Sequence, residues 1–435
     1  MRLSVTAVLV FMALSFVACG GGSSSSGSNS GGGNPPPQPI SGTTATVDFG
    51  ILHQTIRGFG GSDAWIGINS TAEANALFGT GTGQIGLSIL RGRIDPSSTT
   101  PGPQWDAEVS AAQLAIAAGN NVIVFASPWS PPAVWKSNND VSNGGSLNVA
   151  NYGNYANYLA SFVTYMANHG VNLYAISMQN EPDWTATYES CVWTPQQMDT
   201  WVAQLPPGLF GTTKLIMPES LGFNQSYSDP ALSDTNAVGN IRIIGGHLYG
   251  ATPASYASAV NAGKDVWMTE HYLTPTGSGN PQPAIADALA LSKEIHDSMT
   301  VASYNAYVYW WVAEWSGNPN YGLVDTNNNP TYYGWAMTHF ARFVRPGYSR
   351  VDATNNTSGV YISAYSGNGH SVIVAINTNT AAVNQPFTIQ NQALTSLVPY
   401  QTTASSTVVQ QNGVSVSGGQ FTYTLPAQSI TTFVQ

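Results

Sequence analysis

The chain of 435 residues has very few charged side chains. Asp, Glu, Lys and Arg together make up only 8% of it, against roughly 25% in an average soluble protein. Its 12 Lys and Arg residues stand against 22 Asp and Glu residues, which gives a net charge of −10. Nucleic-acid binding requires clustered cations that neutralise phosphates, so the composition argues against a nucleic-acid partner. The polar surface must consist mainly of hydroxyl and amide groups, which suit neutral, hydroxyl-rich ligands.

Cysteine is almost absent. The chain contains only Cys19 and Cys191, and Cys19 lies in a segment that we expect to be processed. Cys191 is then left without an intramolecular disulfide partner, so the fold must depend on packing. The seven histidines show no metal-ligand spacing such as HExxH, and no glycine-rich segment follows a strand as a phosphate-binding loop would. We therefore expect no metal and no other cofactor.

Long apolar runs are also scarce. The run Leu3–Val17 follows Arg2 and is too short to span a bilayer, so we expect an export signal over residues 1–19. It ends in Phe-Val-Ala-Cys-Gly, which resembles a bacterial lipobox with Phe16 in place of the usual Leu. Acylation of Cys19 is therefore expected, and ordinary cleavage nearby is the alternative.

The segment that follows has the composition of a tether. Gly20–Pro39 contains only Gly, Ser, Asn and Pro, apart from Gln38. Such a sequence cannot bury a core and behaves as a flexible coil that stiffens at its prolines. We expect residues 20–42 to link the leader to a globular part. The protein is then secreted or held at the outer surface of a bacterium, by a lipid if Cys19 is acylated, and we expect a monomer.

Strand-like and helix-like segments alternate over residues 55–343. Most of the strands are nearly continuous apolar runs, as in parallel strands buried on both faces. Eight such strands with helices between them predict a (β/α)8 TIM barrel. The expected strands are Thr55–Gly61, Ile85–Ile94, Asn121–Ser127, Val171–Gln179, Lys214–Pro218, Ile241–Leu248, Val266–Glu270 and Tyr304–Trp311. The expected helices are Ala72–Phe78, Ala107–Ala118, Tyr152–Asn168, Pro195–Leu205 and Ala284–Met299.

Residues 344–435 have a different pattern. Their strands are short, alternating and rich in Thr and Val, which predicts a small antiparallel β-sandwich. The expected strands are Val360–Tyr365, Ser371–Asn377, Phe387–Gln390, Val414–Ser417 and Phe421–Leu425. Thr43–Gly50 also resembles a strand but precedes the barrel. We expect residues 43–54 to join the C-terminal strands, so that both chain ends build one side domain.

Two of the predicted barrel strands run directly into a glutamate. The fourth ends before Asn180-Glu181-Pro182, and Pro182 favours an extended backbone at Glu181. The seventh ends in Thr269-Glu270. In (β/α)8 barrels the catalytic groups lie at the carboxyl ends of the strands, and glycosidases use two carboxyl groups on either side of the bond they cleave. A lone Glu after a strand is usually a surface or capping residue, but the Asn-Glu-Pro context of Glu181 favours a catalytic role.

Longer stretches resemble glycoside hydrolase family 30 of clan A, most of all its bacterial subfamily 8 of xylanases and glucuronoxylanases. The similarity extends from about Thr46 to the end of the chain. It is carried by Arg57–Gly61, Leu87–Arg91, Phe125–Pro132, Gly170–Ser177, His247–Gly250, His339–Tyr348 and Leu425–Ser429.

The resemblance implies a retaining mechanism. Glu181 matches the general acid/base and Glu270 the nucleophile. Asn180 matches the residue that binds the sugar 2-hydroxyl, Arg91 a buried cation beside the nucleophile, and Tyr249 a hydrogen-bond donor to it.

Four aromatic residues fit the walls of a sugar-binding groove, with core packing as the alternative for each. They are Trp129 and Trp310, which we favour most, together with Trp65 and Tyr272. Three other strand-end residues are weaker candidates. Glu219 is either a supporting group or a surface residue, and His247 and His271 are expected to hydrogen-bond locally or to sugar.

One departure from the family pattern concerns substrate decoration. Subfamily 8 glucuronoxylanases have an Arg just after strand eight that binds the glucuronic acid branch of the substrate. No Lys or Arg occurs here between Lys293 and Arg342, and the loop Val312–Gly322 offers Glu314 instead. A carboxylate ligand favours a cation, so we expect the requirement for glucuronate to be lost or weakened. Lys136, in the loop after strand three, is the alternative cation.

The resemblance therefore implies an endo-β-1,4-xylanase that acts on xylan and does not depend on glucuronic acid branches. Other activities of the family are the alternatives: a glucuronoxylanase, a xylobiose-releasing exo-xylanase, a β-1,6-glucanase or a β-glucosidase-like enzyme. A non-catalytic glycan-binding protein of the cell surface is the alternative of another class.

Overall fold

The computed structural model describes residues 38–276, 283–315 and 320–435. The expected export signal, Cys19 and most of the tether lie outside this part of the chain, so what the sequence indicates for them stays a prediction. Among the described residues, no helix is both long and apolar enough to traverse a bilayer.

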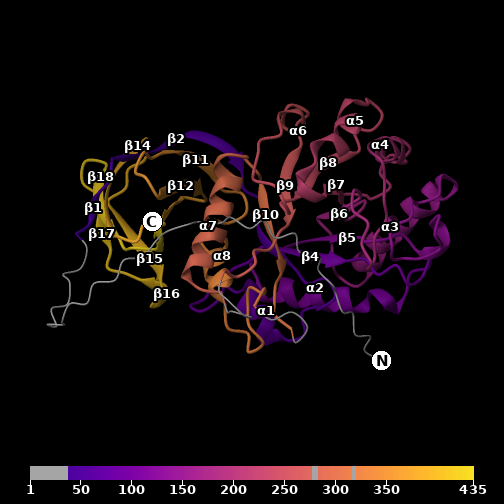
Figure 1. Cartoon of the computed structure of the whole chain (residues 1–435), viewed down its shortest axis with the longest axis horizontal. Coiled ribbons are helices and arrows are strands. Elements are labelled where there is room, and N and C mark those ends of the chain that lie inside the picture. Colours follow the sequence, from indigo (N-terminus) through magenta and orange to yellow (C-terminus); the bar gives the residue numbers. More distant parts are fainter. Residues whose placement is uncertain (1–37, 277–282, 316–319) are drawn as a thin grey trace, which may run out of the picture. The chain divides into compact units, whose positions relative to one another are not determined.

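Eight parallel strands close into a barrel in the order β10-β3-β4-β5-β6-β7-β8-β9, at the centre-right of the molecule in Figure 1. Each overlaps one of the eight expected strands, so the (β/α)8 barrel is confirmed. The strands are β3 (Gly58–Ser62), β4 (Ile89–Arg93), β5 (Ile123–Ser127), β6 (Ala175–Ser177), β7 (Lys214–Ser220), β8 (Ile241–His247), β9 (Asp265–Glu270) and β10 (Ala306–Trp311).

The barrel interior is filled by one inward-facing cluster of buried side chains, contributed by seven of the eight strands: Ile89, Phe125, Ala175, Ile216, Ile243, Trp267, Ala306 and Val308. β3 contributes glycines instead. A Cβ at Gly60 would lie 2.4 Å from the carbonyl oxygen of Ile89, so a side chain there would separate β3 from β4. The glycine therefore allows the barrel to close at this pair of strands.

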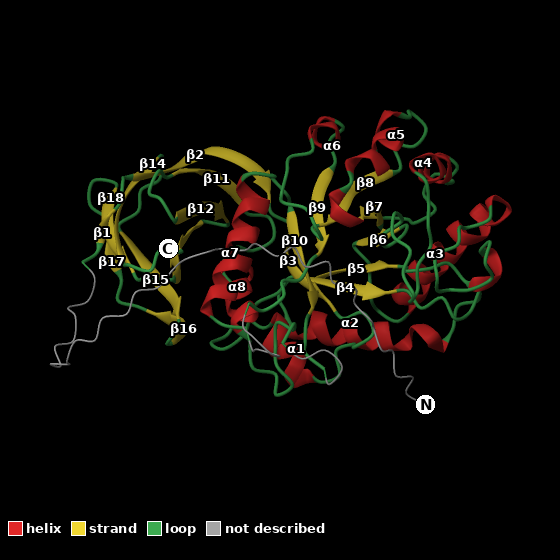
Figure 2. Ribbon diagram, viewed as in Figure 1, coloured by secondary structure: helices red, strands yellow, loops and turns green. Residues whose placement is uncertain are grey.

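Helices cover the outside of the barrel, as Figure 2 shows in red. They are α1 (Thr71–Phe78), α2 (Asp106–Ala118), α3 (Tyr152–Asn168), α4 (Pro195–Ala203), α5 (Asp229–Ser233), α6 (Ala257–Asn261), α7 (Ile285–Thr300) and α8 (Tyr332–Ala341). The five expected helices are confirmed. Three helices were not predicted from the sequence: α5 and α6, which have five residues each, and α8. Seven of the last nine residues of α8 are apolar or glycine and eight are buried, so no polar face marks it as amphipathic.

The side domain is one continuous sheet of eleven strands, mostly antiparallel. The N-terminal strand β2 pairs with β11 and β14, which confirms that both chain ends build it. Its pairing with β14 is parallel, as is that of β1 with β14. The strands are β1 (Ile40–Ser41), β2 (Ala45–Thr55), β11 (Ser349–Thr354), β12 (Val360–Gly367), β13 (His370–Asn377), β14 (Val383–Gln390), β15 (Ser396–Thr403), β16 (Ser406–Gln410), β17 (Val414–Ser415), β18 (Gln420–Leu425) and β19 (Ser429–Val434).

This sheet folds over itself rather than forming two separate sheets. Four strands lie between β14 and β19 along the sheet, yet the ring centroids of Phe387 of β14 and Phe433 of β19 are 5.6 Å apart. Phe421 of β18 packs against both rings. The aromatic cluster therefore fills the space between the two halves of the folded sheet, as a sandwich core does.

Helices α7 and α8 connect the barrel to the sheet. Both contact β19, and α7 also contacts β12 and β13. The buried His339 of α8 is bonded at both ring nitrogens: Nδ1 lies 2.8 Å from Thr432 Oγ1 and Nε2 lies 2.8 Å from Thr402 Oγ1. Burial lowers the pKa of His339 to about 3. The imidazole is therefore neutral in the folded protein and links the helix to two strands.

Acid is expected to destabilise the protein through His339. The unfolded side chain binds a proton below about pH 6.5, whereas the folded one does so only near pH 3. The free energy of unfolding should therefore fall as the pH drops between these values. His339→Leu should lose about 2–4 kcal/mol at neutral pH, because it removes two buried hydrogen bonds between the imidazole and threonine hydroxyls, and its pH slope should be shallower.

Urea unfolding between pH 4 and pH 8 measures both effects. His370→Leu is the control, because His370 is an exposed residue of the same sheet, and it should keep the wild-type slope. An unchanged slope in His339→Leu would contradict the assignment.

Candidate active site

Glu181 and Glu270 lie together at the carboxyl ends of the barrel strands. Glu181 follows β6 and Glu270 ends β9. Both are nearly buried, with exposed fractions of 6% and 5%. A carboxylate oxygen of Glu181 and one of Glu270 lie within 4.8 Å of each other.

That separation distinguishes the two mechanisms that such a pair supports. Retaining glycosidases hold their carboxyl groups about 5–5.5 Å apart, whereas inverting enzymes need about 6.5–9.5 Å so that a water molecule fits between sugar and base. The two oxygens here lie 4.8 Å apart or less, which is closer to the retaining range. The geometry therefore fits attack on the sugar by a carboxylate.

The backbone at Glu181 is left-handed, with φ of 44°, so the expectation of an extended conformation before Pro182 is wrong. Contacts with neighbouring strands explain the difference. The N–H of Glu181 donates to the carbonyl of Glu219 at 3.0 Å, and that of Asn180 donates to the carbonyl of Pro128 at 2.8 Å. Such a conformation costs of the order of 1–3 kcal/mol and persists where the surroundings enforce it. These contacts therefore fix the position from which the Glu181 carboxyl extends.

Arg91 of β4 is fully buried and connects most of the site. Its Nη1 donates to Oε2 of Glu270 at 2.5 Å, and its Nη2 donates to Oδ1 of Asn180 at 2.6 Å. Nη2 also lies 3.2 Å from Oε1 of Glu219. The guanidinium lies 4.7 Å from the ring centroid of Trp129. The structure thus places Arg91 beside Glu270, and Arg91 also orients the Asn180 amide.

Both oxygens of Glu270 are held. The Tyr249 hydroxyl donates to Oε1 at 2.9 Å, while Arg91 donates to Oε2. Burial raises the pKa of Glu270, and the charges of His247 and Arg91 act against this rise. The two cations therefore favour the ionised form of a carboxyl that burial alone would protonate.

His247, a weak candidate from sequence, lies between the two carboxyl groups. Its Nδ1 is 2.9 Å from Oε1 of Glu181 and 3.9 Å from Oε2 of Glu270. Although burial disfavours its charged form, Glu270, Glu181 and Glu219 raise the pKa of His247 to about 9. At neutral pH the ring is therefore an imidazolium, and Nδ1 donates to Glu181.

Glu219, another of these strand-end candidates, is fully buried next to His247. Its Oε2 accepts from the Ser127 hydroxyl at 2.6 Å, and its Oε1 lies 3.8 Å from Nε2 of His247. Burial raises its pKa, but Arg91 and His247 outweigh this effect and lower it to about 2. His247 ends a buried strand, as Glu270 does, and Glu219 is the last residue but one of another. This was the signal available in the sequence.

Aromatic rings form a connected wall beside the pair. Trp65 packs against Trp129 with ring centroids 4.8 Å apart, and against Trp310 at 6.0 Å. Trp65 is 45% exposed, whereas Trp129 and Trp310 are 2% and 6% exposed. Trp129 and Trp310, which were favoured from the sequence, are thus buried, and Trp65 is the tryptophan whose ring is open to a ligand. Tyr272 packs against Tyr249 at 5.4 Å.

Tyr188 belongs to the same wall and was missed. It is 39% exposed, and its ring centroid lies 6.1 Å from that of Trp65. Burial of the hydroxyl and the negative charges of Glu181 and Glu270 raise its pKa. The residues around Tyr188 form a loop without periodicity, so no pattern in the sequence indicated its role.

The loop after β10 adds further rings. Trp315 packs against Trp311 at 4.3 Å, and Tyr321 packs against Tyr272 at 5.2 Å. Ala313 and Val324 form a β-bridge at the base of the loop. Four residues of the loop, 316–319, lie outside the described part of the chain.

The cations nearest the mouth of the site already have partners. Lys136 is only 3% exposed, and its Nζ donates to the carbonyls of Val141 and Ser190 at 3.2 and 2.6 Å. It is therefore not available as a substitute cation for a glucuronate branch. Arg93 forms a two-pronged ion pair with Glu189.

Glu181, His247 and Glu270 present donor atoms close enough together for a metal ion. However, Arg91 already bonds to Glu270, and His247 is an imidazolium that donates to Glu181. Side-chain cations therefore balance the carboxylates, and we assign no metal here.

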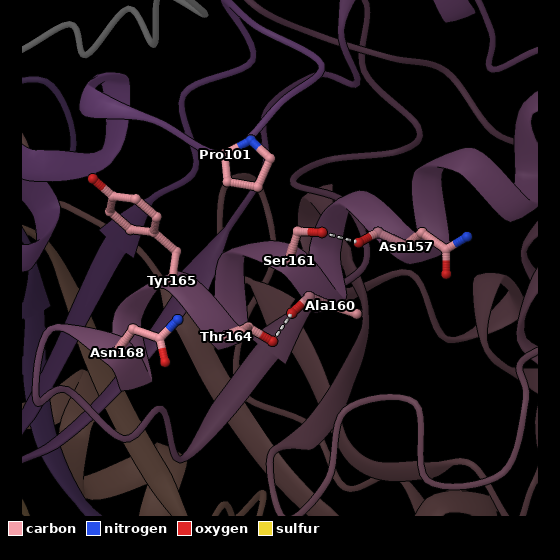
Figure 3. Close-up of a pocket in the computed structure, with 7 residues that line it drawn as sticks. All are labelled: Pro101, Asn157, Ala160, Ser161, Thr164, Tyr165 and Asn168. Carbon is pink, nitrogen blue, oxygen red and sulfur yellow. Dashed lines mark hydrogen bonds between the residues drawn. The ribbon is translucent and has the colours of Figure 1, made fainter.

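A separate depression of about 440 Å³ lies on the outer face of α3 (Figure 3) and is lined by Pro101, Asn157, Ala160, Ser161, Thr164, Tyr165 and Asn168. The hydroxyls of Ser161 and Thr164 donate to carbonyls one turn back in their own helix. The depression has no charged lining residue and presents no reactive group.

Comparison with known proteins identifies the family of this chain. A model of the glycosyl hydrolase family 30 TIM-barrel domain matches residues 103–264. Glucuronoxylanase XynC of Bacillus subtilis (strain 168) is 39% identical over 406 residues, which cover 91% of this chain and 92% of the relative.

Solved structures agree as well. The glycoside hydrolase family 30 subfamily 8 xylanase Xyn30A from Clostridium acetobutylicum is 46% identical, with a TM-score of 0.83 over 90% of this chain and 99% of that one. A GH30 endoxylanase from Clostridium papyrosolvens C71 is 39% identical, with a TM-score of 0.79 over the same shares of the two chains. By its barrel, its paired carboxyl groups and these relatives, the chain belongs to glycoside hydrolase family 30.

Proposed function

We propose that the protein is an endo-β-1,4-xylanase that cleaves xylan with retention of configuration. The observation that carries this proposal is the Glu181–Glu270 pair, whose oxygens lie within 4.8 Å of each other in different surroundings. Glu270 is held by a cation and a phenol, whereas Glu181 bonds only to His247 through its carboxylate among the described residues.

In the first step Glu270 attacks the anomeric carbon while Glu181 protonates the leaving oxygen, which gives a covalent xylosyl-enzyme. In the second step Glu181 removes a proton from water, and the water displaces Glu270. Arg91 occupies the amide oxygen of Asn180, so the amide nitrogen is left to donate to the sugar 2-hydroxyl. That bond strengthens in the transition state and so lowers the barrier.

The substrate assignment rests on the relatives and on the character of the groove. The relatives at 39% and 46% identity are a glucuronoxylanase and a xylanase. The open face of Trp65 and the ring of Tyr188 offer apolar surfaces with polar edges, which suit the faces of sugar rings. Trp129 and Trp310 form the support beneath Trp65.

We further propose that cleavage does not require glucuronic acid branches. Lys136 and Arg93 are engaged by other groups, and the loop after β10 carries Glu314, a group of the wrong charge for a uronate. A charged hydrogen bond to such a branch would contribute about 1.5–3 kcal/mol, and no cation in the described part of the loop is placed to form it.

Hydrolysis of glucuronoxylan and of unbranched β-1,4-xylan should therefore differ less than about tenfold in kcat/KM, since tenfold corresponds to the low end of that contribution. Reducing-end assays with product sizing measure this ratio and distinguish internal from terminal cleavage. A strong preference for glucuronoxylan would contradict the independence from branches. Absence of new reducing ends from every xylan would favour the non-catalytic binding role instead.

Export and acylation of Cys19 belong to the same proposal on sequence grounds alone. A secreted or surface-held enzyme meets a polymer that is too large to enter the cell, and the residues 20–42 would let the catalytic part reach it. A monomeric state is the expectation that accompanies it.

A further inference from the structure

The buried site contains three carboxyl groups and two cations. The carboxyls belong to Glu181, Glu219 and Glu270, and the cations are Arg91 and the imidazolium of His247. Buried charge is tolerated when it is balanced. Two cations balance two carboxylates, so the third carboxyl can carry a proton without leaving net charge in the site. A resting retaining enzyme needs one protonated acid and one ionised nucleophile.

His247 contacts Glu181 in a way that distinguishes the two oxygens of the acid. Nδ1 bonds to Oε1 at 2.9 Å, and no described residue bonds to Oε2. Because an imidazolium can only donate, Oε1 acts as the acceptor. The catalytic proton is then carried by Oε2, the oxygen without a protein partner.

Glu219 holds the other side of the ring. Its Oε1 lies 3.8 Å from Nε2 of His247 and 3.2 Å from Nη2 of Arg91. These are ion-pair contacts, since neither Oε1 nor Nε2 forms a hydrogen bond in the described structure. Its Oε2 is fixed by Ser127, and its backbone carbonyl receives the N–H of Glu181. Glu219 therefore touches the acid from two directions, through the backbone directly and through His247.

We propose that Glu219 and His247 are a positioning pair for Glu181: Glu219 orients the charged His247 ring, and Nδ1 of His247 then holds Oε1 of Glu181 so that Oε2 delivers the proton. This inference rests on the proposed role of Glu181 as acid/base. In this proposal neither Glu219 nor His247 touches the substrate; both act through Glu181.

The proposal predicts opposite pH shifts for two variants. The charged and titratable groups around His247 are Glu181, Glu219, Glu270, Arg91 and, farther out, Asp183 and Tyr249. Glu219→Gln removes a negative charge, so the two catalytic carboxyl groups ionise at lower pH. His247→Gln removes a positive charge, so they ionise at higher pH.

The bell-shaped pH profile of kcat/KM on xylan should therefore move to lower pH in Glu219→Gln and to higher pH in His247→Gln, each by about one pH unit or more. Glu294→Gln is the matched control. Glu294 is also a carboxylate bonded to a strand-end histidine, His271, at 2.8 Å, and its loss should move neither limb.

The fall in kcat/KM that follows from a badly positioned acid should also depend on the leaving group of the substrate. His247→Gln should lower kcat/KM on xylan at least about tenfold, a part of the 10²–10⁴ that general acid catalysis supplies. The same variant should lose far less on a dinitrophenyl xylobioside, whose leaving group needs little protonation. A purely structural defect would lower both rates alike.

A measurement on the wild-type protein avoids dependence on how the variants fold. NMR of histidine labelled with ¹³C in the imidazole should show one ring that titrates near pH 9 and is missing in His247→Gln. If no such ring exists, or if the pH profiles of Glu219→Gln and His247→Gln both coincide with that of the wild type, the proposed positioning pair is wrong. If instead Glu181→Gln retains full activity on xylan, the proposed acid/base itself fails.

Discussion

Replacing Glu270 with Gln is expected to lower kcat on xylan by at least about 10⁴-fold. The amide has almost the same shape but cannot attack the anomeric carbon, so no covalent intermediate forms. The change also removes a buried negative charge and leaves Arg91 and His247 facing a neutral group. Folding should survive, because the amide oxygen can still accept from Arg91.

Three measurements test this expectation. Steady-state kinetics give the loss of rate, and thermal unfolding verifies the fold. A 2-fluoro xylobioside with a good leaving group should label the wild-type protein on Glu270 and leave Glu270→Gln unlabelled. Asp265→Asn is the control, because Asp265 begins the strand that Glu270 ends and pairs with Arg57 outside the site. Label on another carboxylate would overturn the assignment of the nucleophile.

Replacing Glu181 with Ala is expected to separate the two halves of the reaction. Xylan has a poor leaving group, so its hydrolysis should fall about 10²–10⁴-fold without general acid catalysis. A dinitrophenyl xylobioside should still form the intermediate rapidly, but the intermediate should persist because no base activates water. Azide, which needs no base, should restore turnover.

The configuration of the azide product provides the decisive observation. Azide would attack an intermediate bound to Glu270 from the opposite face, so a β-xylosyl azide is expected, with net retention. An α-azide, or no rescue in a folded protein, would contradict the assignment of Glu181 as acid/base with Glu270 as nucleophile. Glu189→Gln is a comparison variant from the loop that follows Glu181, and it should show no azide dependence.

The sequence predicted the barrel well because its strands are continuous apolar runs, and a buried run that ends in Glu is easy to recognise at Glu270. The helix α8 was not predicted, because burial on nearly all sides removes the amphipathic pattern. The prediction of the side-domain strands was incomplete, because β15 and β19 were not expected. Both carry many polar residues that are nevertheless buried, Thr402, Thr431 and Thr432 among them.

Within the site, positions along the chain were predictable but contacts between strands were not. That Glu219 and His247 meet around Glu181 depends on the register of β7 and β8, which includes irregular pairings between Pro218 and Ser220. The left-handed backbone at Glu181 depends on hydrogen bonds to Glu219, and no local preference indicates it. The burial of Trp129 beneath Trp65 likewise follows from three-dimensional packing.

The joining of both chain ends in one sheet has a consequence for how the protein folds. The Thr43 and Thr357 side chains that hydrogen-bond at this join are 314 residues apart in sequence. During synthesis, β2 emerges early and must wait for β11 and β14 before it has any partner. Pairing over such a separation is slow, and the unpaired strand is exposed meanwhile. Completion of the side domain is therefore a late event, and a chain that stops before β11 is left with β2 as an unpaired strand beside the barrel.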